Sequence, residues 1–113
     1  MAYRGEVWET LLDPSLGREQ EGKQRPCLVV SADQLNQGQS GLVIVIPMTR
    51  ADRRIPSHVA INPPEGGVSD RSFIMCEQMR SVSYSNRLQK RLGTVTTATL
   101  LEVTEKLRFL LNL

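Results

Sequence analysis

The sequence is poor in the features that mark several common classes of protein. Aromatic residues make up only 4% of its 113 residues, and it has two cysteines and one histidine. The longest apolar run, Leu42 to Met48, is far too short to span a bilayer. The N-terminus has no apolar segment of the kind found in signal peptides. We therefore expect a cytoplasmic protein with no membrane partner.

The scarcity of metal-ligating residues limits the chemistry that the chain could use. Cys27 and Cys76 each lie inside an apolar run, with no Cys-x-x-Cys pair and no histidine cluster nearby. We interpret them as small buried hydrophobic residues rather than metal or redox groups. Because His58 is the only histidine, the sequence excludes the class of nucleases that use a pair of histidines. The position of His58 in the middle of an expected strand is typical of a structural or exposed residue. We expect no cofactor and no metal.

The net charge of +2 is too small to indicate a nucleic-acid partner by itself. The choice of cation is more informative, because the chain has eleven arginines and three lysines. Arginine has a planar fork that grips phosphate with two hydrogen bonds and stacks on bases. An ordinary solvated surface is the alternative explanation. The arginines in loop-like or strand-end stretches are Arg18, Arg25, Arg50, Arg53, Arg54, Arg80, Arg87 and Arg91.

The pattern of apolar residues predicts one mainly β domain over residues 1–113, with no internal repeat or linker. A turn is expected at 13–17 and an exposed loop at 18–24. Pro47 is expected to end the pairing of the third strand, which should be buried on both faces. A small SH3-like β-barrel is the natural architecture for such short strands. The expected strands are 5–12, 26–30, 42–48, 57–62, 72–82 and 92–95.

The last segment changes to helical periodicity and predicts an amphipathic C-terminal helix that caps the barrel. Its proposed start is a capping pattern in which Thr97 and Thr99 precede Glu102. A similar pattern at 31–34 predicts a short helical turn. The apolar stripe of the C-terminal helix is expected to pack on the core. Its members are Leu100, Val103, Leu107, Leu110 and Leu111.

Four stretches go beyond a generic barrel. They are RGEVW at 4–8 leading to LDP at 12–14, GREQEGKQRP followed by LVVS at 17–31, PMT at 47–49, and SFIMCEQMRS at 72–81. Together, in this order and spacing, they closely resemble the MazF/PemK toxins of bacterial toxin–antitoxin systems. The resemblance runs from about Arg4 into the C-terminal helix.

The resemblance implies a CcdB/MazF/PemK-type fold and a homodimer with two RNA-binding grooves across the dimer face. It implies sequence-specific cleavage of single-stranded RNA that needs neither a metal nor the ribosome. It also implies a cognate antitoxin, MazE- or PemI-like, whose disordered and partly acidic tail occupies the groove.

Metal-free RNA cleavage normally uses the ribose 2′-OH as the nucleophile and leaves a 2′,3′-cyclic phosphate and a 5′-OH. It requires removal of that proton, stabilisation of the phosphorane, and protonation of the leaving oxygen. Arg25 is our first candidate for the phosphate, and pairing with Glu19 or Glu21 is its structural alternative. We do not expect Arg25 to act as the base, because an arginine hardly deprotonates in a protein. The resemblance adds Thr49 as a hydroxyl donor, although a threonine at a strand end is more often structural.

Glu19 is the candidate general base, with a solvated loop carboxylate as its alternative. Glu77 is a weaker acid or base candidate, because relatives that use an Asp there have an Arg two residues earlier and this chain has Met75. If 72–82 is one regular strand, Gln78 and Arg80 point to the same face of it and Glu77 points to the opposite face. The residues expected to contact RNA are Gln20, Arg18, Arg50, Glu77, Gln78 and Arg80.

Two other functions fit the same kind of fold. A CcdB-like poison would bind DNA gyrase and cleave nothing, but those relatives lack the Gly-x-Glu-Gln loop, the Arg-Pro pair and the Pro-Met-Thr set. A non-catalytic SH3-like binding module is also permitted by the fold. Such modules usually present an aromatic-lined groove, and this chain is poor in aromatic residues.

Overall fold

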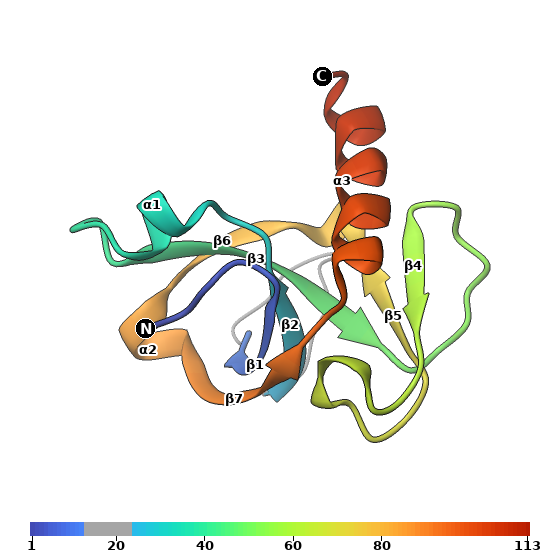
Figure 1. Cartoon of the computed structure of the whole chain (residues 1–113), viewed down its shortest axis with the longest axis horizontal. Helices are drawn as coiled ribbons and strands as arrows, with labels where there is room; N and C mark the ends of the chain where they lie inside the picture. Colours follow the sequence, from blue (N-terminus) through green and yellow to red (C-terminus); the bar gives the residue numbers. More distant parts are fainter. Residues whose placement is uncertain (13–23) are drawn as a thin grey trace.

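The computed structural model describes residues 1–12 and 24–113. The turn expected at 13–17 and residues 18–23 of the loop expected at 18–24 lie outside the described residues, whereas Gln24 lies in a strand and not in the expected loop. In the described part, seven strands precede a C-terminal helix, α3 (Figure 1). The strands are β1 (Glu6–Leu11), β2 (Gln24–Val29), β3 (Leu42–Thr49), β4 (His58–Ile61), β5 (Ser72–Met75), β6 (Arg80–Ser83) and β7 (Leu88–Thr94). The α-helices are α1 (Asp33–Asn36), α2 (Tyr84–Arg87) and α3 (Thr97–Leu111), and the 3₁₀ turns are η1 (Glu65–Gly67) and η2 (Cys76–Gln78).

The strands form one curved antiparallel sheet in the order β4-β5-β3-β2-β1-β7, and β6 also pairs with β3. The mainly β fold with a C-terminal helix is confirmed. The barrel is not closed, because no pairing joins β4 to β7 among the described residues. The edge of β7 meets η1 instead, where Gly67 and Gly93 lie backbone to backbone. Side chains at these positions would collide with the opposing backbone.

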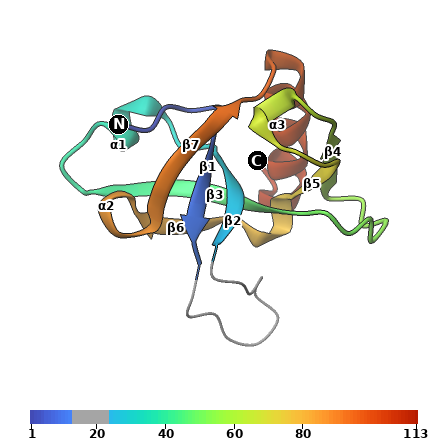
Figure 2. The same ribbon diagram turned by 90° about the horizontal axis from the view of Figure 1, so that it is seen from below.

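Strand β3 runs through the middle of the sheet (Figure 2). It is buried on both faces over most of its length, as its continuous apolar run predicts. Ile46 and Met48 enter a core that includes Val103 of α3, whereas Val43 and Val45 enter a second core on the other face. The two cysteines are also buried, Cys27 in the second core and Cys76 in the first. Burial raises the pKa of both thiols to about 12.

The single strand predicted at 72–82 is wrong, because η2 divides this segment into β5 and β6. Both strands pair along the same side of β3, through Ile74 opposite Met48 and Arg80 opposite Val45. The stretch from Ile74 to Arg80 therefore lies opposite the much shorter stretch from Met48 to Val45 of β3, so the residues between Ile74 and Arg80 cannot all pair with β3. They are taken up in the turn of η2.

Pro47 does not end its strand, contrary to the prediction. It is the last residue of β3 to pair with β2, opposite Cys27. The strand continues to Thr49, because Met48 and Thr49 pair on the other side with β5. The missing N–H of proline therefore limits the ladder on one side only.

The N-cap of helix α3 lies one residue before the predicted capping pattern. Thr96 is the N-cap, and its side chain accepts a hydrogen bond from the Thr99 N–H at 3.2 Å. Glu65 of η1 caps this end rather than Glu102, because its Oε2 accepts from the Thr96 N–H at 3.0 Å and from the Thr99 hydroxyl at 2.5 Å. Helix α1 forms as expected, but Ala32 is its N-cap and no side chain caps it.

The apolar stripe of α3 packs on the core only in its first part. Val103 is buried there, and Leu100 and Leu107 pack against the same cluster. Leu110 and Leu111 are exposed, in contrast to the prediction, because the helix continues beyond the edge of the sheet (Figure 1). None of the described helices is long and apolar enough to cross a membrane.

Candidate active site

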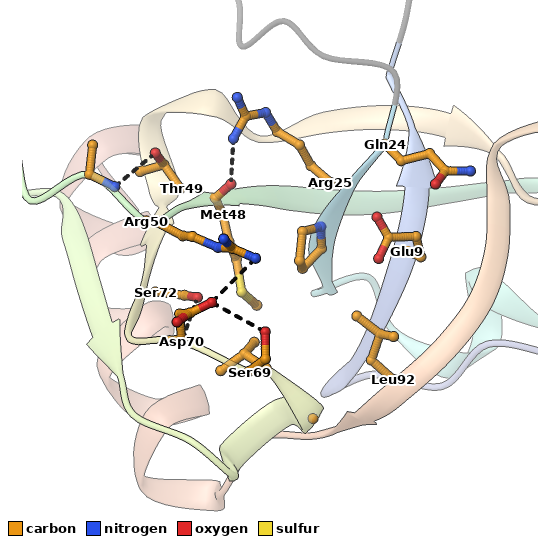
Figure 3. Close-up of a pocket in the computed structure, with 14 residues that line it drawn as sticks. Glu9, Gln24, Arg25, Met48, Thr49, Arg50, Ser69, Asp70, Ser72 and Leu92 are labelled. Atoms are coloured by element: carbon orange, nitrogen blue, oxygen red, sulfur yellow. Dashed lines mark hydrogen bonds and ion pairs between the residues drawn. The ribbon is translucent and has the colours of Figure 1, made fainter.

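A pocket of about 520 Å³ opens where the start of β2 meets the end of β3 (Figure 3). Its other walls come from β1, from β7, and from the segment between η1 and β5. Residues from five separate parts of the chain therefore share one cavity. The lining residues are Glu9, Gln24, Arg25, Pro26, Met48, Thr49, Arg50, Ala51, Gly67, Val68, Ser69, Asp70, Ser72 and Leu92.

Arg25 reaches the pocket from the start of strand β2. Its backbone is fixed, because it pairs with Thr10 of β1 and the next residue, Pro26, pairs with Glu9. The half-buried side chain extends toward β3, where Nη1 donates to the carbonyl oxygen of Met48 at 3.4 Å. The guanidinium therefore lies next to the backbone that leads into Thr49.

Thr49 is the last residue of β3, and it is only 5% exposed. Pairing with Phe73 of β5 holds its backbone in the sheet. Its Oγ1 accepts a hydrogen bond from the Ala51 N–H at 3.2 Å. Because a hydroxyl can accept and donate at the same time, the proton of Thr49 stays available for an acceptor in the pocket.

Arg50 and Asp70 form an ion pair on one side of the pocket, with Nη2 and Oδ2 3.3 Å apart (Figure 3). Their side chains are 75% and 56% exposed. Ser69 donates its hydroxyl to the same Oδ2 at 3.3 Å, and Ser72 donates to the Asp70 carbonyl at 2.9 Å. These contacts fix where the carboxylate lies, although such an exposed pair adds at most about 1 kcal/mol to stability.

The pocket thus combines arginine cations, a positioned hydroxyl and two carboxylates, those of Glu9 and Asp70. Within the described ranges, no group of three His, Cys, Asp or Glu side chains is arranged to hold a metal ion. Guanidinium groups beside a hydroxyl donor are suited to a phosphate group and to negative charge that develops on it. The arrangement therefore fits chemistry at a phosphodiester.

Comparison with known proteins decides the family. The model of the PemK-like, MazF-like toxins of type II toxin–antitoxin systems matches residues 3–111. The chain belongs to this family. Endoribonuclease MazF9 of Mycobacterium tuberculosis is 33% identical to it over 118 aligned positions, which cover 100% of this chain and 98% of the relative.

Solved structures of PemK/MazF-like toxins share the fold. MazF of Deinococcus radiodurans superposes with a TM-score of 0.87 at 29% identity, covering 99% of this chain and 97% of that chain. A chain of one MazE–MazF structure from the same organism (Form-II) superposes with a TM-score of 0.78 at 31% identity, covering 99% of this chain and 96% of that chain. The toxin fold is therefore conserved over nearly the whole length of this protein.

The structure of this PemK/MazF-like toxin brings three of the predicted site residues together. Arg25, Thr49 and Arg50 all line the pocket. Glu19, Gln20 and Arg18 lie outside the described residues. Their proposed roles stay predictions.

Glu77 does not line the pocket. Its carboxylate accepts from the Ser57 hydroxyl at 2.5 Å and lies 2.8 Å from Nε2 of His58, whose side chain is almost fully buried. Burial alone would raise the pKa of Glu77, but the hydrogen bonds from Ser57 and His58 outweigh it and lower the pKa. Glu77 therefore joins η2 to β4, and His58 has the structural position that we expected.

Gln78 and Arg80 are half-buried and do not line the pocket either. The prediction that they share a strand face is wrong, because Gln78 belongs to η2 and only Arg80 belongs to a strand. Their predicted contacts with RNA are not tested by this geometry.

Sequence reasoning missed two acidic residues of the pocket, Glu9 and Asp70. Glu9 lies in β1, where apolar and polar residues nearly alternate. The two-residue period of a strand places Glu9 on the same face as Val7. That pattern could have indicated an inward-facing charge. Asp70 gave no such signal, because it lies in a loop next to Arg71 and reaches the pocket only through the fold.

Proposed function

We propose that this chain is a sequence-specific endoribonuclease that cleaves single-stranded RNA in the cytoplasm without a metal ion or the ribosome. One observation carries the proposal: Arg25 and Thr49, far apart in the sequence, line one pocket of about 520 Å³. The curated relative MazF9 is named an endoribonuclease, which supports the same reaction class.

The proposed reaction is attack of a ribose 2′-oxygen on the adjacent phosphorus. The P–O bond to the next nucleotide breaks and its 5′-oxygen takes up a proton from solvent water, so that the products are a 2′,3′-cyclic phosphate and a 5′-hydroxyl. Negative charge grows on the non-bridging phosphate oxygens during the attack. Groups that bind this charge more strongly than the ground-state phosphate lower the barrier.

Arg25 is proposed to bind the developing phosphorane charge. Its fork can donate two hydrogen bonds, and its half-buried position weakens screening by solvent. Thr49 is proposed to donate its hydroxyl proton to a phosphate oxygen, since Ala51 already donates to its oxygen. The two groups would act on one phosphate from neighbouring positions on the pocket rim.

The proton of the 2′-OH needs a different group. We propose Glu19 for this role, because an arginine stays protonated in a protein and cannot accept a proton near neutrality. Arg50 would hold a neighbouring phosphate, and Arg18 and Gln20 would add contacts from the part of the sequence between β1 and β2. Contacts from Glu77, Gln78 and Arg80 would extend the bound RNA beyond the pocket.

Two protein partners are part of the proposal. The first is a cognate MazE- or PemI-like antitoxin whose acidic tail would compete with RNA for Arg25 and Arg50. The second is another copy of this chain. The exposed end of α3 supports a homodimer, because Phe109 is 84% exposed and Leu111 is 50% exposed.

The deciding experiment incubates the purified protein with a long unstructured RNA in excess EDTA and maps the cut sites and end groups. A copy of one cut site with a 2′-O-methyl group tests the nucleophile. Arg25→Ala tests the phosphate contact, and Arg25→Lys keeps the charge without the fork. Arg108→Ala, an exposed arginine on α3, controls for the loss of one positive charge.

We expect cuts at a short recurring sequence, cyclic-phosphate ends and no cleavage of the 2′-blocked copy. Arg25→Ala should slow cleavage by about 100-fold or more, and Arg25→Lys should restore only part of the rate. Intact RNA across varied sequences would overturn the proposal, and inhibition of gyrase supercoiling would then point to the CcdB-like alternative. RNA that binds tightly but is never cut would instead indicate a binding module.

A further inference from the structure

The two carboxylates of the pocket, Glu9 and Asp70, are not explained by phosphate chemistry. Negative side chains repel a phosphodiester, so they would weaken RNA binding if they only faced the backbone. Both line the same cavity as Arg25 and Thr49. A carboxylate only accepts hydrogen bonds, and RNA offers such donors on its bases and on its 2′-hydroxyl groups.

Asp70 is held as an acceptor that faces the pocket. Arg50 and Ser69 both contact Oδ2, each at 3.3 Å. The other oxygen, Oδ1, accepts no hydrogen bond from the parts of the chain that the structure describes. Because Ser72 fixes the Asp70 backbone, this open oxygen keeps a defined place in the wall.

Glu9 faces Asp70 from the opposite side of the cavity, where Figure 3 shows it across from Arg50. Its backbone is paired on both sides, with Pro26 of β2 and with Lys90 of β7. A side chain on a paired strand keeps its direction better than one on a loop. The acceptors therefore stand on two walls, with the Arg50 donor between them.

The volume fits one nucleotide unit. A cavity of about 520 Å³ lies within the range of pockets that enclose small organic ligands. The aliphatic side chains of Leu92 and Val68 and the ring of Pro26 give it apolar surface that a flat base can contact. A base in this cavity would leave its phosphate beside the wall formed by Arg25 and Thr49.

We propose that this pocket reads one base of the RNA, and that Glu9 and Asp70 select a base with an exocyclic amino group over uracil. Adenine, cytosine and guanine each carry an amino group that can donate to a carboxylate. Uracil has carbonyl oxygens on both sides of its single N–H. These oxygens are acceptors, so their lone pairs would be repelled by the carboxylates of Glu9 and Asp70. The inference rests on the proposed ribonuclease function, for which it supplies the specificity.

The test is a cut-site profile on an RNA pool with a randomised segment, compared for the wild type, Glu9→Gln and Asp70→Asn. An amide has nearly the shape of the carboxylate but also donates, so it accepts uracil as a partner. Glu105→Gln, an exposed glutamate on α3, controls for loss of one negative charge. Thermal melting of each variant shows that the fold is retained.

We expect the wild type to disfavour uracil at one position beside the cut by about 5- to 150-fold. Glu9→Gln and Asp70→Asn should lose most of that discrimination at the same position and keep the preferences elsewhere, and Glu105→Gln should match the wild type. A wild type with no bias against uracil at any position overturns the inference. Variants with the wild-type bias also overturn it, and both results leave the ribonuclease intact.

A second readout separates the inference from the proposed function. Fluorescence anisotropy measures binding to 2′-O-methyl oligonucleotides that carry each of the four bases in turn at every position. If a variant or the wild type cuts no RNA, a wild-type preference for amino-bearing bases that both amide variants lose still supports the inference. Equal affinities for all four bases in the wild type overturn it.

Discussion

Removal of the Glu65 carboxylate should uncouple helix α3 from the 3₁₀ turn η1. One oxygen of this side chain, Oε2, accepts hydrogen bonds from the Thr96 N–H at 3.0 Å, the Thr96 hydroxyl at 3.2 Å and the Thr99 hydroxyl at 2.5 Å. Hydrogen bonds to a charged group contribute about 1.5–3 kcal/mol, and a carboxylate at a helix N-terminus adds about 0.3–1 kcal/mol. Because the Glu65 site is half-exposed, water can replace part of the lost hydrogen bonding. We therefore expect Glu65→Ala to lower the free energy of unfolding by about 2 kcal/mol.

Thermal unfolding at fixed protein concentration measures the effect. At about 4 °C for each kcal/mol in a chain of this size, Glu65→Ala should lower Tm by about 8 °C. Glu65→Gln keeps an acceptor but not the charge, and neutral hydrogen bonds are about half as strong, so its Tm should fall by about 4 °C. Glu105→Gln, on the exposed face of the same helix, is the control for charge alone.

The pH dependence gives a second, independent check. Burial alone would raise the pKa of Glu65, but the hydrogen bonds from Thr99 and Thr96 outweigh it and lower the pKa below its ordinary value of 4.5. The unfolded chain therefore binds this proton more readily. The contribution of the ionised carboxylate is complete above pH 4.5 and is lost as the pH falls through the lower pKa of the folded state.

The stability difference between the wild type and Glu65→Gln should therefore shrink in acid. A Glu65→Ala protein that melts within about 2 °C of the wild type at neutral pH would refute the capping role. A difference that stays constant down to about pH 3 would refute the electrostatic part of the argument.

Three further changes test other parts of the structure. Gly67→Ala should destabilise the fold by about 3 kcal/mol, because φ is +72° there and a Cβ would overlap the Leu92 carbonyl; chemical denaturation measures this, and an unchanged midpoint contradicts it. Thr49→Val should slow RNA cleavage by about 100-fold or more while Thr49→Ser retains most of it, since only the hydroxyl is proposed to act; equal single-turnover rates for the two variants would remove Thr49 from the mechanism. Phe109→Glu should convert a dimer to a monomer in sedimentation analysis, with the core unchanged because Phe109 is 84% exposed; a variant that remains dimeric places the interface elsewhere.

Much of the local structure could be predicted from the sequence. The buried central strand follows from its continuous β-branched run, and α3 follows from its helical period. The burial of Cys27 and Cys76 follows from their apolar neighbours. These features depend on residues a few positions apart, and a linear pattern carries that information well.

The predictions that failed depend on pairing between distant segments. The strand expected at 72–82 was broken because β5 and β6 share one side of β3, and the register of β3 is set by that sheet. The capping role given to Glu102 belongs to Glu65, which reaches Thr96 only in the folded chain. Local sequence cannot indicate a cap that comes from so far away.

The candidate site divides in the same way. The sequence by itself determined the family, through motifs whose order and spacing can be read directly, and it indicated Arg25 and Thr49 as candidates. Only the tertiary structure placed Glu9 and Asp70 in the same pocket as Arg25, because strands β1 and β2 and the segment between η1 and β5 meet there. The fold also decided that the end of α3 is exposed. An apolar stripe shows which face of a helix can pack on a core, but it does not show how far the sheet beneath the helix extends.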